Sequence, residues 1–255
     1  MSLIIGATFK DQFAMMSGDT KTVKVTYSRD KDGHITGELG ETPTDIRMEK
    51  VRKLSNYVIL GHVGLHSVCC RIEDALMTRT KPSDDLRTCA AVLADIIAEL
   101  REESEQDFCP FLDSLNTETA PYVGVRLVGF FENGNTGVAA FETGPDSQVE
   151  TFEFSATAES YPTFLRGVGD ELMDDDTPDP FYNGGKEVTV DNMRGTIGMI
   201  HTCISFANPD SVSSELQLFT LTKPKQAGDP PVFTYEEIDT APFHERLNTL
   251  AKGNE

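Results

Sequence analysis

The chain has 255 residues, with 42 acidic and 22 basic side chains and a net charge of −20 at pH 7. This charge repels phosphate backbones and anionic membrane surfaces, so we expect neither nucleic acid nor a membrane as a partner. No apolar run approaches the roughly 20 residues of a membrane-spanning helix and the start lacks a signal-peptide pattern, so we expect one cytoplasmic domain over residues 1–255.

The first half of the chain predicts strands followed by two helices. Leu3 to Ile5 form a hydrophobic strand that stops at Gly6, and a second strand passes through Phe13 and Met15 to a turn at residues 17–19. Residues 21–27 alternate as a strand, whereas residues 35–45 are rich in Gly, Thr and Glu and predict a surface connection. Residues 46–51 and 54–61 read as a strand pair that enters the core. Helical spacing follows at residues 65–76 and, after a cap at Ser83 to Asp85, at residues 86–100.

The second half repeats this order. We expect strands at residues 122–131, 138–143 and 149–154, helices at residues 161–172 and 190–207, strands at residues 216–222 and 232–238, and a closing helix at residues 241–251. Groups of strands and pairs of helices thus alternate along the chain. This order predicts an α+β fold, with two sheets stacked face to face and helices outside them in a four-layer sandwich.

The number and spacing of the cysteines and histidines predict neither a metal site nor a disulfide framework. The five cysteines, which have no C-x-x-C pair, are Cys69, Cys70, Cys89, Cys109 and Cys203. Their odd number and apolar surroundings favour reduced core residues. His62 and His66 are four residues apart, but no Glu follows His62 as a zinc-protease helix requires. We therefore expect no metal and no other cofactor.

Ser2 is the first candidate for chemistry. Initiator methionine is normally removed before a residue as small as serine, which would make Ser2 the first residue of the mature chain. A free α-amine titrates near ~7.7–8.0, so at neutral pH part of it can accept the proton of its own hydroxyl. The alternative is a buried first strand that carries an incidental serine.

Three further segments contain candidate site residues. Lys50 enters an apolar strand, where an ammonium must find a carboxylate or suffer a lowered pKa; a lysine whose charged end reaches solvent at a strand end is the alternative. Gly61 and Gly64 lie where a strand passes into a helix, and glycines there let backbone N–H groups face a developing negative charge. Asp210 and Ser213 lie between a helix and a strand, in a composition that turns also favour.

These residues together resemble a known family. The pieces that carry the resemblance are Ser2, Gly6, Asp19 after a glycine, Lys50-Val51, Gly64, Gly129 in Leu-Val-Gly-Phe, and Asp210-x-x-Ser213. In order and character they look like the proteasome β-subunit and its bacterial ring-peptidase relatives, which are N-terminal nucleophile (Ntn) hydrolases. The resemblance covers residues 1 to about 222, and the C-terminal extension at about 223–255 matches loosely.

The resemblance implies a four-layer αββα sandwich and a threonine-type peptidase site. Ser2 takes the place of the N-terminal threonine nucleophile, and Lys50 takes that of the lysine which lowers its pKa. Gly64 corresponds to the glycine whose N–H forms the oxyanion hole. Asp210 and Ser213 match the pair near the nucleophile's amine, and Ser155 is a weaker match for the serine before the third helix.

The chain departs from the family pattern in three places. The nucleophile is a serine, which the wider superfamily permits. Counted from Ser2, the family's carboxylate position holds Gly18, and the acid is Asp19. A slip of one residue turns a side chain to the other face of a strand, so we expect Asp19 to serve only if a bulge restores its direction. The segment between Asp19 and Lys50 is also longer than is usual in the family.

Three functions remain open at this point. The first is a peptidase or amidase that uses Ser2 after removal of Met1. The second is an inactive scaffold or assembly subunit with the same fold. The third is a transpeptidase or ligase, in which an amine resolves the acyl-enzyme. The resemblance implies a peptide or protein substrate, and His62 and His66 would flank the cleft that binds it. It also implies a homo-oligomer, such as a ring. It leaves open whether the chain has an ATPase partner.

Overall fold

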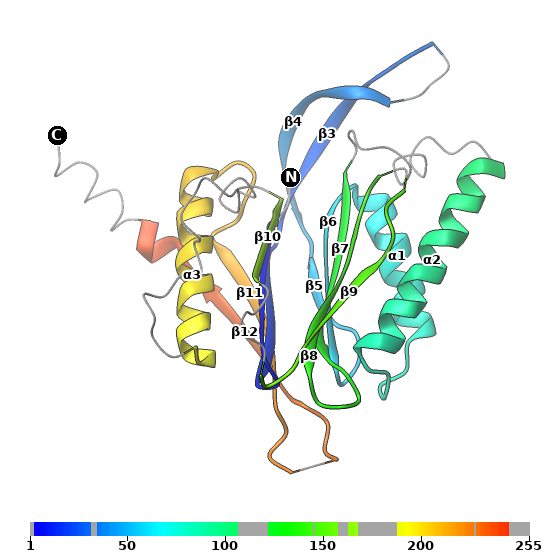
Figure 1. Cartoon of the computed structure of the whole chain (residues 1–255). Coiled ribbons are helices and arrows are strands. Elements are labelled where there is room, and N and C mark those ends of the chain that lie inside the picture. The colour runs from blue at the N-terminus through cyan, green and yellow to red at the C-terminus, as the bar shows by residue number, and fades with distance from the viewer. Residues whose placement is uncertain are drawn as a thin grey trace.

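The structure is a computed structural model that describes residues 3–31, 35–106, 122–144, 146–157, 163–167, 188–226 and 228–244. These residues form a mixed α and β fold whose sheets are antiparallel (Figure 1). Three helices and a helical turn at residues 241–244 accompany the strands. The predicted α+β class is therefore confirmed.

The first five-stranded sheet contains the first and the last strand of the described residues. Its order is β10 (Thr163–Gly167), β1 (Leu3–Phe9), β2 (Phe13–Asp19), β11 (Glu215–Thr222) and β12 (Val232–Asp239). Helix α3 (Val190–Ala207) lies along one face of this sheet (Figure 1). Leu3, Ile5 and Met15 of the sheet pack there against Ile197 and Ile200 of the helix.

The second five-stranded sheet follows the chain more simply. Its order is β5 (Val51–Lys53), β6 (Val58–Gly64), β7 (Val123–Phe130), β8 (Thr136–Glu142) and β9 (Glu150–Phe154). Helices α1 (His66–Arg79) and α2 (Leu86–Gln106) lie along its outer face (Figure 1). Leu60 and Val125 of the sheet share a buried cluster with Ile72 and Leu93 of the helices.

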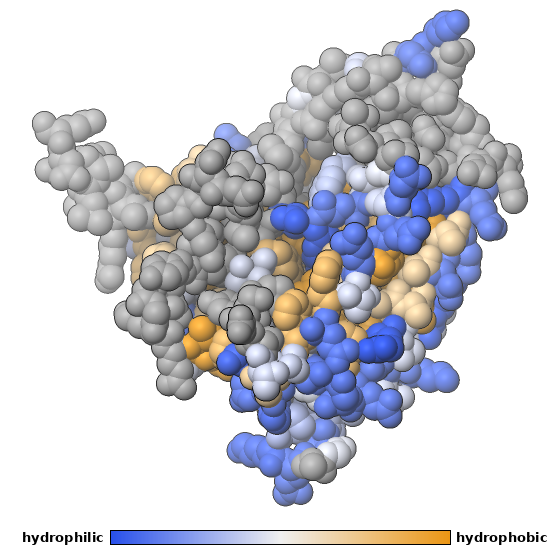
Figure 2. Space-filling view, viewed as in Figure 1, coloured by the Kyte–Doolittle hydropathy of each residue, from blue (hydrophilic) through white to orange (hydrophobic). Residues whose placement is uncertain are grey.

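A third buried cluster joins the two sheets. Ile4 and Met16 of the first sheet pack against Val51, Ile59 and Val128 of the second. Side chains alternate between the two faces of a strand, so each sheet contributes one face to its helices and the other face to this cluster. In the view of Figure 2, hydrophobic residues gather in the middle of the molecule, over the region where the two sheets face each other.

Several of the predicted elements are confirmed. Helices α1, α2 and α3 and strands β7, β8 and β9 lie where the sequence pattern predicts them. The strand predicted at residues 46–51 is not confirmed, since β5 begins only at Val51. The cap of α2, predicted at Ser83 to Asp85, is Asp85, whose Oδ1 accepts the backbone N–H of Thr88 at 2.9 Å. The prediction that the first strand ends at Gly6 is wrong, since β1 continues to Phe9. A side chain at position 6 would collide with the ring of Phe164, at 2.3 Å from the nearest ring carbon, and glycine makes that close approach possible.

Two further predictions are wrong. Residues 163–167 form β10, which pairs with β1, and not part of a helix over residues 161–172. The apolar residues of this stretch fit helical spacing and a short buried strand equally, and Phe164 packs between the sheets. Residues 35–45 belong to β4 (Ile35–Arg47) and not to a surface connection, because β3 (Lys21–Arg29) supplies a pairing partner. Residues 168–172 and 245–251 lie outside the described residues.

Strands β3 and β4 form a separate ribbon that projects beyond both sheets (Figure 1). Its register shifts near the base, between Lys21 and Val23. There Thr22 Oγ1 lies 2.6 Å from Thr44 Oγ1 and donates to the carbonyl oxygen of Ile46 at 2.7 Å. The chain therefore enters the ribbon directly after β2 and leaves it shortly before β5.

Within the described residues, no helix combines the length and the apolar character that crossing a membrane requires.

Candidate functional site

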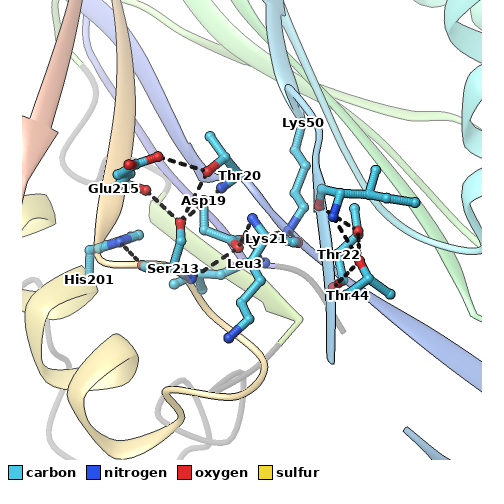
Figure 3. A network of polar contacts seen from close by, with 11 residues as sticks. Leu3, Asp19, Thr20, Lys21, Thr22, Thr44, Lys50, His201, Ser213 and Glu215 are labelled. Carbon is cyan, nitrogen blue, oxygen red and sulfur yellow. Dashed lines mark hydrogen bonds and ion pairs between the residues drawn. The ribbon is translucent and has the colours of Figure 1, made fainter. Parts of the chain in front are cut away.

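A buried ion pair lies where the ends of the two sheets meet (Figure 3). Asp19, the last residue of β2, accepts a hydrogen bond from Lys50 Nζ at 2.5 Å, and Lys50 directly precedes β5. The two side chains are 0% and 3% exposed. An isolated buried charge is costly, and each side chain supplies the partner that offsets the cost of burying the other.

The carboxylate of Asp19 also collects backbone N–H groups from distant segments. Asp19 Oδ1 accepts the N–H of Leu3 at 2.8 Å, and Oδ2 accepts the N–H of Lys21 at 2.9 Å and that of Ser213 at 3.4 Å. These donors satisfy the hydrogen-bond acceptors of the buried carboxylate. Asp19 thus connects the start of β1, the ribbon, the segment before β11 and the second sheet.

Lys50 has a lowered pKa because burial disfavours its charged form, and the charge of Asp19 opposes this effect. Its Nζ donates to Asp19 and to the carbonyl oxygen of Lys21, at 2.5 Å in each case. An ammonium has three N–H donors. Two of them are used by acceptors within the described part of the chain.

The position of the acid needs no bulge, contrary to the expectation from sequence. Pairing of β2 with β1 and with β11 runs without a register shift through these residues. Gly18 faces the second sheet, where an added Cβ would lie 2.8 Å from Val51 Cγ2 and 3.4 Å from Lys50 Cβ. A side chain at position 18 has no room, and Asp19 reaches Lys50 from the end of the strand. The prediction that Asp19 requires a bulge is therefore wrong.

Ser213 forms the next layer of contacts around the ion pair. Its Oγ accepts the N–H of Thr20 at 3.1 Å and donates to the carbonyl oxygen of Glu215 at 3.0 Å. Thr20 Oγ1 donates to Glu215 Oε2 at 3.4 Å. These bonds hold the segment before β11 against the end of β2 (Figure 3).

His201 completes the network, although it belongs to no motif in the sequence. Its Nε2 lies 2.9 Å from the carbonyl oxygen of Ser213, which can only accept, so Nε2 carries the proton. Nδ1 is buried and has no hydrogen-bond partner within the described residues. Burial lowers the pKa of His201 to about 4, so the ring is neutral at pH 7. The one available signal was a histidine within the apolar face of α3, between Ile197 and Ile204.

The remaining predicted site residues are not joined to this network by hydrogen bonds within the described residues. Ser2 lies outside the described residues, so its predicted role is untested. Gly64 ends β6 and does not open α1, which begins at His66 after Leu65. Its φ of 108° and an added Cβ at 1.9 Å from the carbonyl oxygen of Tyr122 both require glycine.

Asp210 and Ser155 lie elsewhere. Asp210 is exposed in the turn after α3. Ser155 follows β9, where its Oγ lies 3.0 Å from Thr157 Oγ1. Of the predicted residues, the structure therefore brings together Asp19, Lys50 and Ser213.

A cavity of about 560 Å³ adjoins the network. Thr20, Lys21 and Ser213 line it on the side of the ion pair. Ser205 and His244 also line it, with His244 Nε2 2.9 Å from Ser205 Oγ. Polar groups thus surround a space that a small ligand or a peptide end can occupy.

The two histidines that were expected to flank a substrate have partners of their own. His62 is buried between β6 and α1, with Nε2 2.8 Å from Glu73 Oε2. His66 Nδ1 lies 3.1 Å from Cys70 Sγ on the surface of α1. Among the described residues, no group of three His, Cys, Asp or Glu side chains is arranged to hold a metal ion.

No protein-family model matches this chain, and a search of curated proteins finds no similar sequence. The functional conclusion therefore depends on the arrangement around Asp19 and Lys50.

Proposed function

We propose that the chain is a proteasome-like Ntn hydrolase that cleaves peptide or amide bonds with Ser2 as its nucleophile after removal of Met1. One observation carries the proposal: the buried Lys50–Asp19 pair contacts the backbone nitrogen of Leu3, the atom to which Ser2 is covalently attached. Lys50 also keeps one N–H donor beyond its two described acceptors. A cation beside the chain start lowers the pKa of a hydroxyl nucleophile.

The reaction follows from the chemistry of an N-terminal hydroxyl. The Ser2 amine takes the hydroxyl proton while Oγ bonds to the substrate carbonyl carbon, and the N–H of Gly64 stabilises the oxyanion. When the C–N bond breaks, the Ser2 ammonium returns the proton to the leaving amine. Water then attacks the ester with the amine as base, which releases the acid and restores Ser2. General acid–base catalysis of this kind contributes about 10²–10⁴ in rate.

The proposal includes the finer description of the fold. Three buried clusters separate α3, the first sheet, the second sheet and the α1–α2 pair. We interpret this order as the four-layer αββα sandwich of Ntn hydrolases. The same proposal gives the chain a peptide or protein substrate and a cytoplasmic location. It also includes assembly into a homo-oligomer, for example a ring.

A specific observation favours the inactive scaffold as the second candidate. The N–H that binds Asp19 belongs to Leu3 and not to the first residue of the chain. Asp19 is already satisfied by three backbone N–H groups and Lys50. An ion pair that is complete without Ser2 is also what a purely structural role requires.

Intact-mass measurement combined with a covalent probe distinguishes these candidates. After confirming by mass that Met1 is absent, the chain is incubated with a β-lactone, which acylates hydroxyl nucleophiles. The hydrolase proposal predicts one adduct on the peptide that begins with Ser2. The adduct should disappear in Ser2→Ala and fall at least tenfold in rate in Lys50→Met.

Lys53→Met is the matched control, since Lys53 lies on β5 and its Nζ donates to Asn56 Oδ1 and not to Asp19. This variant should keep the native labelling rate. Retained Met1, or no adduct on a chain that lacks Met1, would support the scaffold and reject the hydrolase. A new amide product in the presence of an added amine would identify the transpeptidase.

A further inference from the structure

A second cavity, of about 810 Å³, lies between the two sheets beside the edge strand β10. β10 contributes Phe164 and Arg166 to its lining, and the second sheet contributes Arg126, Glu142 and Phe152. Among the described residues, it shares no lining residue with the cavity beside Asp19 and Lys50. It is therefore a separate space with a wall from each sheet.

Two arginines in this cavity share one carboxylate oxygen. Glu142 Oε1 accepts the Nε–H of Arg166 at 2.6 Å and an N–H of the Arg126 guanidinium. The Arg126 side chain is 5% exposed, and burial together with the charge of Arg166 lowers its pKa to about 10. Arg126 is therefore charged at pH 7, and a single carboxylate cannot neutralise both guanidinium groups.

Arg126 also keeps hydrogen-bond donors beside the cavity. One terminal nitrogen of its guanidinium donates to the carbonyl oxygens of Val125 and Phe141, at 3.1 Å in each case, and the other donates to Glu142. A guanidinium has five N–H donors. Acceptors within the described residues thus use three of them, and two remain for a further acceptor.

Two other carboxylates line the cavity but leave this cation in place. Asp146 and Glu150 are exposed, and within the described residues Arg126 and Arg166 pair with Glu142 and with neither of these two. Water screens exposed charges strongly, whereas a buried charge is screened much less. The buried guanidinium of Arg126 therefore attracts an anion that enters the cavity, although the chain as a whole carries a charge of −20.

The cavity lies close to the start of β1. Arg166 on β10 is the pairing partner of Ile4, which packs between the two sheets. Ser2 precedes Ile4 by two residues, which is a span of at most about 7 Å. A peptide that reacts at Ser2 can therefore place a group near the reacting bond in this cavity.

We propose that the cavity binds a carboxylate of the peptide substrate, with Arg126 and Arg166 as its donors. The two guanidinium groups supply the charge and the N–H donors that a carboxylate accepts. Phe152 and Phe164 supply apolar wall for the methylene groups of an acidic side chain. A C-terminal carboxylate has the same chemistry, and the experiment below distinguishes the two sources. This inference rests on the proposed function, since it names the substrate of the Ser2 site.

Calorimetric titration of the Ser2→Ala chain measures binding without cleavage. The probes are acetyl-Ala-Ala-Glu-Ala-amide, its Gln counterpart, and the Gln peptide with a free C-terminal carboxylate. At least one carboxylate peptide should bind about tenfold more tightly than the amidated Gln peptide, and the tighter of the two identifies the source. Arg126→Gln and Arg166→Gln should each remove this preference. Glu142→Gln should strengthen it, because the carboxylate that competes with the ligand is gone.

Arg79→Gln and Glu99→Gln are the matched controls, because they break an ion pair between α1 and α2 and should leave all three affinities unchanged. Circular dichroism verifies that each variant is folded, and the Arg166 and Glu142 variants suffice if Arg126→Gln is not. Equal affinities for the three peptides, no binding of either carboxylate peptide, or weaker binding by Glu142→Gln overturns the subsite.

Cleavage by the native chain separates the subsite from the hydrolase proposal. The carboxylate peptide that binds more tightly should be cleaved with a kcat/KM about tenfold above that of the amidated Gln peptide. A β-lactone adduct on Ser2 together with equal affinities rejects the subsite and keeps the hydrolase. No adduct on a chain that lacks Met1 rejects the hydrolase, and with it the role of the cavity in substrate binding, whatever the affinities are.

Discussion

Replacing Lys50 by methionine tests the energetic role of the buried ion pair. Methionine keeps the length and the apolar part of the lysine side chain but leaves the carboxylate of Asp19 buried without its cation. Breaking a buried ion pair in this way typically costs about 3–5 kcal/mol. We expect the low end of this range, because three backbone N–H groups still bind Asp19.

Urea denaturation followed by circular dichroism measures the effect. The expected loss in the free energy of unfolding is about 3 kcal/mol, which for a chain of this size lowers the melting temperature by roughly 6–12 °C. Lys225→Met removes an exposed cation and should change the free energy by less than about 0.5 kcal/mol. The double variant Asp19→Asn/Lys50→Met should lose less than the sum of its single variants, by about 1–3 kcal/mol.

Two results would refute this reasoning. One is a Lys50→Met variant within about 1 kcal/mol of the native chain, which would mean that the ammonium contributes little to the folded state. The other is strict additivity of the two single variants. In that case Asp19 and Lys50 would act independently, although their side chains are in contact.

Three other predictions follow from the same region and from α2. Gly18→Ala should destabilise the chain by about 1–3 kcal/mol in urea denaturation, because the new Cβ would press on Val51. The pKa of His201 is lower in the folded state (about 4) than its ordinary value of 6.5, so its contribution to stability is complete above pH 6.5 and declines as pH falls toward 4. Thermal melts should show that His201→Gln loses about 3 kcal/mol of this pH dependence relative to the native chain. Asp85→Ala removes the cap that accepts the N–H of Thr88 and should lower the free energy of unfolding by about 1 kcal/mol; a variant as stable as the native chain would contradict the capping role.

The helices could be predicted from sequence because each has a continuous apolar face. Residues 65–76, 86–100 and 190–207 repeat apolar side chains at helical spacing, and α1, α2 and α3 follow. β10 and β4 could not be predicted for different reasons. β10 has five residues, and an apolar pattern of that length does not distinguish a buried strand from a helical turn. β4 is rich in Gly, Thr and Glu, so it lacks the alternation of apolar and polar residues that a half-buried strand shows.

The candidate site was only partly predictable. Lys50 and Asp19 could be selected by resemblance, but their contact depends on Gly18, which leaves space for Lys50 where a side chain would obstruct it. Sequence spacing alone placed the acid on the wrong face of the strand. His201 could not be selected, since its role comes from the carbonyl group of Ser213, and a backbone contact of this kind leaves no motif.

Asp19 binds amide protons of residues that lie up to 194 positions away from it in the sequence. Hydrogen–deuterium exchange at Leu3, Lys21 and Ser213 therefore reports on one shared acceptor. These amides should exchange together when the carboxylate is released, at a rate set by that local opening and not by the separate segments to which they belong.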